Sequence, residues 1–108
     1  MDERLERYDL SGGPQRCINL YRRCGGRAIV AHPAWSLNTV ATLSALQDVT
    51  AAEIYNSVST YPWNGDRADS SNVLDVAAAH GALYRFVASD DSHRYQGEAG
   101  RAFTMVQA

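Results

Sequence analysis

The stretch Arg27-Ala-Ile-Val-Ala-His-Pro33 is a short apolar run with β-branched residues at its centre, and it ends at a histidine followed by a proline. Because its apolar residues do not alternate with polar ones, we expect a strand over residues 27–31 that is buried on both faces. Strands of this kind belong to parallel sheets that helices cover. Residues 51–55 and 83–88 also favour strands.

The segments beside these strands favour helices. Apolar residues recur every three or four positions, as in an amphipathic helix, in residues 14–24, 39–47 and 72–80. Asn38 is the expected N-cap of the second helix, and Ser70 or Ser71 that of the third. Gly81 stands where a helix commonly ends. The third helix is expected to turn its apolar side to the core, with Val73, Leu74, Val76 and Ala77.

The alternation of helices and strands predicts an α/β fold, because parallel strands need helical crossovers between them. Residues 102–106 favour a fourth strand. The polar segment 56–69, which carries Tyr61 and Trp63, is expected to be a long loop. No change of composition marks a boundary, so we expect one domain over residues 1–108.

The composition is that of a globular domain: 108 residues, 45% hydrophobic and 20% charged, with a formal net charge of −2. No apolar run is long enough to cross a bilayer and the start is too charged for a signal peptide, so we expect a cytoplasmic protein without a membrane partner. The basic residues are all arginines and are scattered along the chain, which argues against a nucleic-acid partner. Cys17 and Cys24 are expected to pack as small apolar side chains, since their spacing is not that of a zinc motif.

Polar side chains follow each of the three central strands, where a buried strand has no need of them. The carboxyl ends of parallel strands lie on the same side of a sheet or barrel, so these groups are expected to converge. Imidazole and carboxylate together suit Zn²⁺, Mn²⁺ or Fe. The residues concerned are His32, Glu53, Asn56, Asp90, Asp91 and His93.

Each of these polar positions also has a structural explanation. A histidine before proline can be an exposed turn residue, and Asp90 and Asp91 can cap a turn. Glu53 is harder to explain in this way, because a carboxylate inside an apolar strand needs a partner. His80 lies in the last turn of a predicted helix, where an imidazole interacts favourably with the helix dipole, so we expect it to be structural.

Three motifs, in this order, carry a resemblance to a known family. They read Val30-Ala-His-Pro-Ala-Trp-Ser36, Ala52-Glu-Ile-Tyr-Asn56 and Val87-Ala-Ser-Asp-Asp-Ser-His93. They resemble the carboxyl-terminal half of the PHP-domain phosphoesterases, the polymerase and histidinol phosphatase superfamily. The likeness covers about residues 25–106.

The resemblance implies a distorted (βα)7 barrel, of which this chain would form the carboxyl-terminal half. It implies hydrolysis of a phosphate-ester substrate by water that divalent metal ions, Mn, Zn or Fe, activate. It assigns His32, Asp91 and His93 as metal ligands, with Asp91 and His93 also in the catalytic role. The positions expected to orient ligands or to line the substrate pocket are Glu53, Asn56 and Asp90.

The chain departs from the family in one respect. PHP enzymes open with a His-x-His motif on their first strand, whereas this chain has three histidines and none in that pattern. We therefore expect the isolated chain to be inactive and to need an amino-terminal half, or to form a homo-oligomer. The alternative is a non-catalytic fragment or interaction module. The substrate is left open, and the loop with Tyr61 and Trp63 is expected either to shape its pocket or to cover the core.

Overall fold

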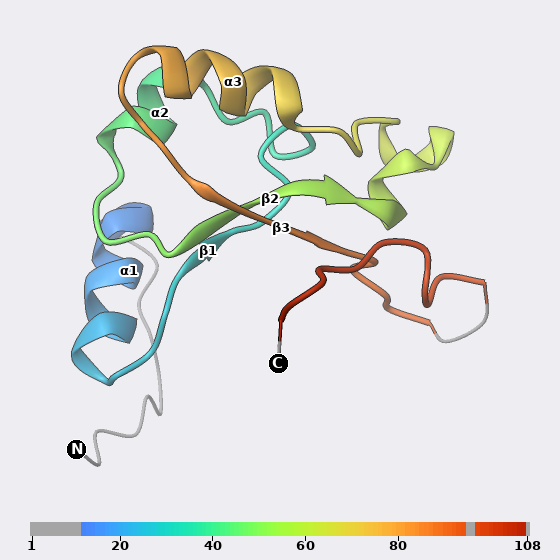
Figure 1. Ribbon diagram of the computed structural model, residues 1–108, viewed down its shortest axis with the longest axis horizontal. Helices are drawn as coiled ribbons and strands as arrows, with labels where there is room; N and C mark the ends of the chain where they lie inside the picture. Colours follow the sequence, from blue (N-terminus) through green and yellow to red (C-terminus); the bar gives the residue numbers. More distant parts are fainter. Residues whose placement is uncertain (1–11, 95–96, 108) are drawn as a thin grey trace.

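The computed structural model describes residues 12–94 and 97–107 (Figure 1). Helices and strands alternate within this part, and two short 3₁₀ helices, η2 (Ser57–Thr60) and η3 (Pro62–Asn64), follow the second strand. The alternation confirms the predicted α/β class. The helices and strands are α1 (Gly13–Arg23), β1 (Ile29–Val30), α2 (Val40–Ala45), β2 (Ala51–Asn56), α3 (Ser71–Ala79) and β3 (Arg85–Ser89).

The strands of the described part form one parallel sheet in the order β1-β2-β3. The register places Ile29 of β1 level with Ala51 of β2, and Ala51 level with Arg85 of β3. All carboxyl ends therefore lie at one end of the sheet, where β2 leads into η2 and η3 (Figure 1). The pairing of β2 with β3 shifts between Glu53 and Tyr55, so the sheet is irregular next to that end.

The core lies between the sheet and helices α2 and α3, which run side by side over it (Figure 1). Its buried centre consists of Leu43 of α2, Ala52 of β2, and Leu74 and Ala77 of α3. Positions 74 and 77 are three apart and therefore share one face of the helix. Val76 lies away from that face and is 40% exposed, so the prediction that it faces the core is wrong.

The first strand is shorter and more exposed than expected. The predicted strand over residues 27–31 is confined to β1, and Ile29 is 53% exposed because β1 is the edge strand of the described sheet. Helix α2 begins after Thr39 rather than after Asn38. Thr39 Oγ1 accepts a hydrogen bond from the Thr42 N–H at 3.1 Å, which is the contact of an N-cap.

The start of α3 is connected to the turn after β1. Ser70 precedes α3 as predicted, but its Oγ accepts a hydrogen bond from the Ala34 N–H at 2.9 Å instead of capping its own helix. Asp69 Oδ1 takes the capping contact and accepts from the Ser71 N–H at 2.8 Å. The buried Ser70 side chain therefore fixes the chain that leaves β1 against the helix that precedes β3.

Residues 102–106 do not form the predicted fourth strand. Thr104 Oγ1 accepts a hydrogen bond from the Ala88 N–H at 2.9 Å and donates to the Ala88 carbonyl oxygen at 3.1 Å. A side chain thus occupies main-chain groups of β3 that a neighbouring strand would pair with. The apolar side chains on both sides of it remain in solvent, with Phe103 68% and Met105 86% exposed.

No helix within residues 12–94 and 97–107 is long and apolar enough to cross a membrane. Cys17 and Cys24 are half-buried free thiols, as expected of small apolar side chains. His80 caps the end of α3, where its N–H donates to the Val76 carbonyl oxygen and its Nδ1 lies 2.9 Å from the same oxygen. That contact gives His80 the structural role expected from its position.

Candidate functional site

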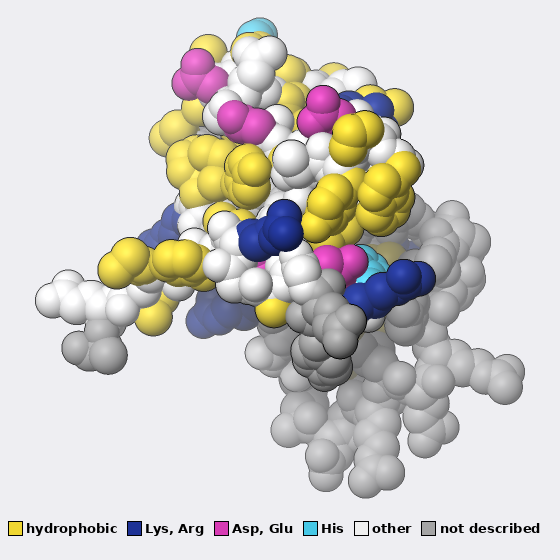
Figure 2. Space-filling view, turned by 90° about the vertical axis from the view of Figure 1, so that its right-hand side faces the viewer, with side chains coloured by type: hydrophobic (Ala, Val, Ile, Leu, Met, Phe, Trp, Pro, Cys, Tyr) yellow, Lys and Arg dark blue, Asp and Glu magenta, His cyan; other side chains and the backbone are white. Residues whose placement is uncertain are grey.

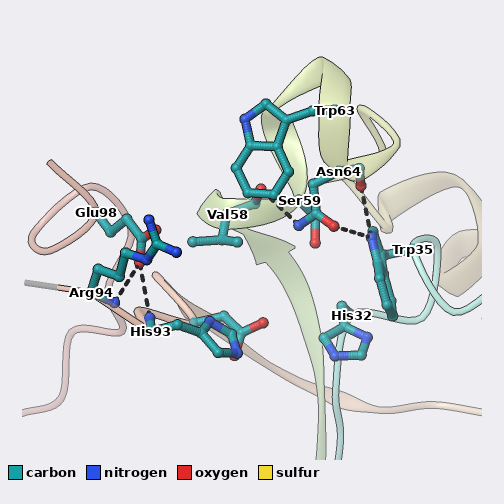
Figure 3. Close-up of a pocket in the computed structure, with 10 residues that line it drawn as sticks. His32, Trp35, Val58, Ser59, Trp63, Asn64, His93, Arg94 and Glu98 are labelled. Carbon is teal, nitrogen blue, oxygen red and sulfur yellow. Dashed lines mark hydrogen bonds between the residues drawn. The ribbon is translucent and has the colours of Figure 1, made fainter.

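A pocket opens at the carboxyl end of the sheet (Figure 3). Its volume is about 640 Å³, which is in the range of small-molecule sites. Three of the six predicted site residues line it, namely His32, Asp91 and His93. Figure 2 shows this end of the molecule, where histidine, acidic and basic side chains lie next to one another below a group of hydrophobic ones.

His32 follows β1 and is held from several sides. Its φ of 30° lies in the left-handed region, which residues other than glycine rarely adopt. Its Nδ1 lies 2.7 Å from Ser36 Oγ, and its ring packs edge-on against Trp35 with centroids 4.9 Å apart. Because Ser36 engages Nδ1, the Nε2 atom is the ring nitrogen left for a ligand.

Glu53 joins the carboxyl ends of all three strands. It is 5% exposed, and its Oε2 accepts hydrogen bonds from the His32 N–H at 2.6 Å and from Asn56 Nδ2 at 3.0 Å. Its Oε1 accepts a hydrogen bond from the Ser89 hydroxyl at the end of β3. Glu53 therefore lies behind the pocket and positions the chain that carries His32.

Asn56 continues this network toward the pocket. It is fully buried, and its Oδ1 accepts hydrogen bonds from the Ser59 N–H at 3.1 Å and from the Ser59 hydroxyl at 3.0 Å. Ser59 itself lines the pocket. Asn56 thus connects the buried Glu53 to the wall that η2 supplies.

Asp91 and His93 follow β3 on a short loop. Asp91 has a φ of 53°, again in the left-handed region. The N–H groups of His93 and Arg94 each donate to Glu98 Oε2 at 2.9 Å. These two hydrogen bonds hold the pKa of Glu98 below its ordinary value, and the bond from the Arg94 N–H has the larger effect. Glu98 therefore fixes the loop that brings an imidazole and a guanidinium to the pocket (Figure 3).

Asp90 lies outside the lining of the pocket. Its carboxylate accepts hydrogen bonds from the N–H groups of Ala102 at 2.6 Å and Arg101 at 2.8 Å, and from that of Gly100. The bond from Ala102 is the largest cause that lowers the pKa of Asp90. Asp90 thus attaches the segment after residue 99 to the end of β3, which agrees with the structural explanation of this position and not with a place in the lining of the pocket.

Two tryptophans line the pocket: Trp35 lies beside His32, and Trp63 of η3 lies across from the two histidines (Figure 3). Trp63 is 75% exposed and stacks on Tyr61 with centroids 5.4 Å apart. Trp35 Nε1 donates a hydrogen bond to the Asn64 carbonyl oxygen at 2.7 Å. The loop with Tyr61 and Trp63 was expected either to shape the pocket or to cover the core. Trp63 agrees with the first expectation, because it lines the pocket and its ring is too exposed to cover the core.

Several pocket residues could not be singled out from the sequence. Trp35 stands inside the first motif, and aromatic residues in a polar loop are a general sign of a surface that contacts something. Arg94 and Glu98 give no such sign, because exposed charged residues are common on any surface. Their position depends on a loop contact that connects residues four and five positions apart.

The donor types at this pocket suit a divalent metal ion, but the donors do not complete a site by themselves. Within residues 12–94 and 97–107 no group of three or more His, Cys, Asp or Glu side chains is arranged to hold a metal ion. His32, Asp91 and His93 share the pocket without forming such a group. A metal ion bound here needs donors from outside the described residues or a rearrangement of these side chains.

Comparison of the chain with family models, with curated proteins and with solved structures finds no match. The likeness to the PHP family therefore rests on the three motifs. Residues from the first and third motifs line the pocket at the carboxyl end of the parallel sheet, and Glu53 and Asn56 of the second lie directly behind it.

Proposed function

We propose that this chain is the carboxyl-terminal part of a PHP-type, metal-dependent phosphoesterase. His32, Asp91 and His93 bind one side of a divalent metal centre, with Mn²⁺, Zn²⁺ or Fe as candidates. In the described residues these three side chains share the pocket but are not arranged around one ion, so the centre needs a rearrangement of them or further donors from outside the described residues. The substrate is a phosphate ester that occupies the pocket.

The observation that carries the proposal is the shared pocket of His32, Asp91 and His93. These residues follow two different strands, and two of them have a backbone in the left-handed region. Such conformations occur at functional sites and also in turns, as at Leu37, Asp48 and Asp66 outside the pocket. Here Glu53 maintains the conformation of His32 through a 2.6 Å hydrogen bond to its N–H.

Other side chains of the pocket suit a phosphate ester. The Arg94 guanidinium can bind two phosphate oxygens at once. Ser36 orients the His32 ring through Nδ1, and Trp35 and Trp63 supply apolar surface to the lining of the pocket. A divalent metal ion, when bound, would polarise a phosphoryl oxygen.

The alternative is a non-catalytic module that kept the PHP fold and lost the chemistry. The lack of a group of three donors within the described residues favours it. The two candidates differ in what they need from the pocket. An enzyme needs metal-binding side chains at positions 32, 91 and 93, whereas an interaction module does not.

Metal analysis of the purified chain tests the proposal. The chain is dialysed against Mn²⁺ or Zn²⁺, and the bound metal is measured for the unaltered protein and for His32→Ala, Asp91→Ala and His93→Ala. We expect each substitution to lower the metal affinity about tenfold or more. His80→Ala is the matched control, since this histidine is at the end of α3 and should leave metal binding unchanged. Equal metal content in all of these samples would contradict the proposal and favour the interaction module.

The activity of the isolated chain is a separate prediction. We expect little or no hydrolysis of a generic aryl phosphate with added Mn²⁺, because an incomplete centre cannot stabilise both the attacking and the leaving oxygen. Turnover of about 1 s⁻¹ or more that His93→Ala abolishes would show that the chain is an enzyme by itself.

A further inference from the structure

A second polar hollow, of about 340 Å³, lies at the amino end of the sheet, away from the pocket described above. We call it the arginine hollow. It is lined by Arg22, Arg27, Asp48, Val49, Thr50 and Arg85.

The fold gathers arginines that are far apart in the sequence. Arg22 lies in the last turn of α1, Arg27 precedes β1, and Arg85 is the first residue of β3. Because the strands are parallel, their amino ends lie together. The register places Arg85 level with Ile29, and Ile29 is two residues after Arg27. The scattered arginines of the sequence thus form a local basic cluster in a chain of net charge −2.

The three guanidinium groups are available to a ligand. Across residues 12–94 and 97–107, none of them forms a hydrogen bond or an ion pair with the protein, and all three residues are exposed. Arg67 shows the contrast, since its guanidinium donates to the carbonyl oxygens of Trp35 and Gly65. Asp48 supplies one negative charge, so the lining keeps a surplus of two positive charges.

We propose that the arginine hollow binds a small phosphate-type anion with two or more negative charges, such as inorganic pyrophosphate. A guanidinium binds phosphate oxygens through paired, charge-assisted hydrogen bonds, and three such groups from separate elements surround one volume. The hydroxyl of Thr50 adds a neutral donor. The volume suits a small molecule.

This site is separate from the candidate metal pocket. The 6 residues of β2 lie between Thr50 in the hollow and η2 at the pocket, which corresponds to about 20 Å of extended chain. The inference therefore does not depend on the proposed phosphoesterase function. It would hold equally for a non-catalytic module.

Isothermal titration with sodium pyrophosphate tests the inference. The buffer contains a chelator, so that no metal ion at the other pocket contributes to anion binding. We expect Arg27→Gln and Arg85→Gln each to weaken binding about tenfold. Arg23→Gln is the matched control, because Arg23 neighbours Arg22 on α1 but does not line the hollow. Binding should also weaken as ionic strength rises, since exposed charges are screened by salt.

Further titrations distinguish binding in the arginine hollow from binding in the candidate metal pocket and from binding of a nucleic acid. His93→Ala should bind pyrophosphate as tightly as the unaltered chain, and inorganic phosphate, with less charge, should bind more weakly. Unchanged affinity in Arg27→Gln and Arg85→Gln, or a loss in His93→Ala, would overturn the inference. So would tighter binding of a single-stranded oligonucleotide that the same arginine substitutions abolish. Arg22→Gln provides a third variant if thermal unfolding shows that either of the first two is not folded.

Discussion

Glu53 is buried, and its carboxylate accepts hydrogen bonds from three donors that belong to the ends of different strands. A carboxylate inside an apolar strand costs free energy unless such donors surround it. The sequence alone indicated that Glu53 needs partners. It could not indicate that one partner is the main chain of His32, because that contact joins positions 21 residues apart.

Removal of the Glu53 carboxylate should destabilise the chain strongly. Glu53→Ala leaves the donors of His32, Asn56 and Ser89 without an acceptor, so we expect the free energy of unfolding to fall by about 3 kcal/mol. Glu53→Gln should cost less, about 1 kcal/mol, because its amide oxygen keeps two donors and its NH₂ group can donate to the serine hydroxyl. Urea unfolding measures both values. Asp75→Ala on the exposed side of α3 is the control, and equal losses for the two Glu53 variants would contradict this account.

Asp91 offers a test of whether backbone conformation is maintained for function. Glycine adopts a φ of 53° without steric cost, so Asp91→Gly should leave the free energy of unfolding unchanged or raise it by up to about 1 kcal/mol. Metal affinity should fall about tenfold or more in the same variant. Ser92 does not have a positive φ, so Ser92→Gly relieves no backbone strain and should be slightly destabilising. A clear loss of stability in Asp91→Gly would mean that the carboxylate supports the fold instead.

At the scale of elements, the sequence predicted the alternation of helices and parallel strands, and its apolar patterns were most informative for α2, β2 and α3, which bury apolar side chains in the core. It failed where tertiary contacts decide the outcome. Residues 102–106 have the composition of a strand, but Thr104 binds Ala88 through its side chain and the segment stays outside the sheet. At α3 the predicted Ser70 does precede the helix, but its hydroxyl binds Ala34 from the turn after β1, and Asp69 makes the capping contact instead.

The attachment of the last segment to β3 should depend on pH. The pKa of Asp90 lies below its ordinary value of 3.8, foremost because of the hydrogen bond from the Ala102 N–H. A lowered folded pKa means that the contribution of Asp90 is present above about pH 3.8 and is lost as the pH falls through the lower, folded value. We expect the amide signals of Gly100, Arg101 and Ala102 to shift together in this acidic range in a nuclear magnetic resonance titration. Asp90→Asn should remove that shared titration, and its persistence would assign the effect to another group.

At the scale of the whole molecule, the described sheet ends in two strands without further strand partners, β1 and β3. Ile29 on β1 and Phe86 on β3 are about half exposed, and Leu83 before β3 is 82% exposed. Phe86 also lines a hollow of about 430 Å³ beside α3, together with Ile54 and Leu74. The composition indicated a globular domain, but it could not show that apolar side chains would remain at the edges of the sheet.

Thr104 occupies the main-chain groups of Ala88, but no strand of the described residues covers the rest of the β3 edge or the β1 edge. Such edges with exposed apolar side chains favour association between chains. We therefore expect the isolated 108-residue chain to self-associate, with a mass in light scattering that rises above 11.8 kDa as concentration increases. Phe86→Ser removes an apolar ring at the β3 edge and should shift this association to higher concentration. Leu37→Ser is the matched control: Leu37 is 70% exposed but lies in the turn after β1, so its loss should not matter. A monomer at every concentration, or equal effects of the two substitutions, would show that the β3 edge is not the surface through which the chains associate.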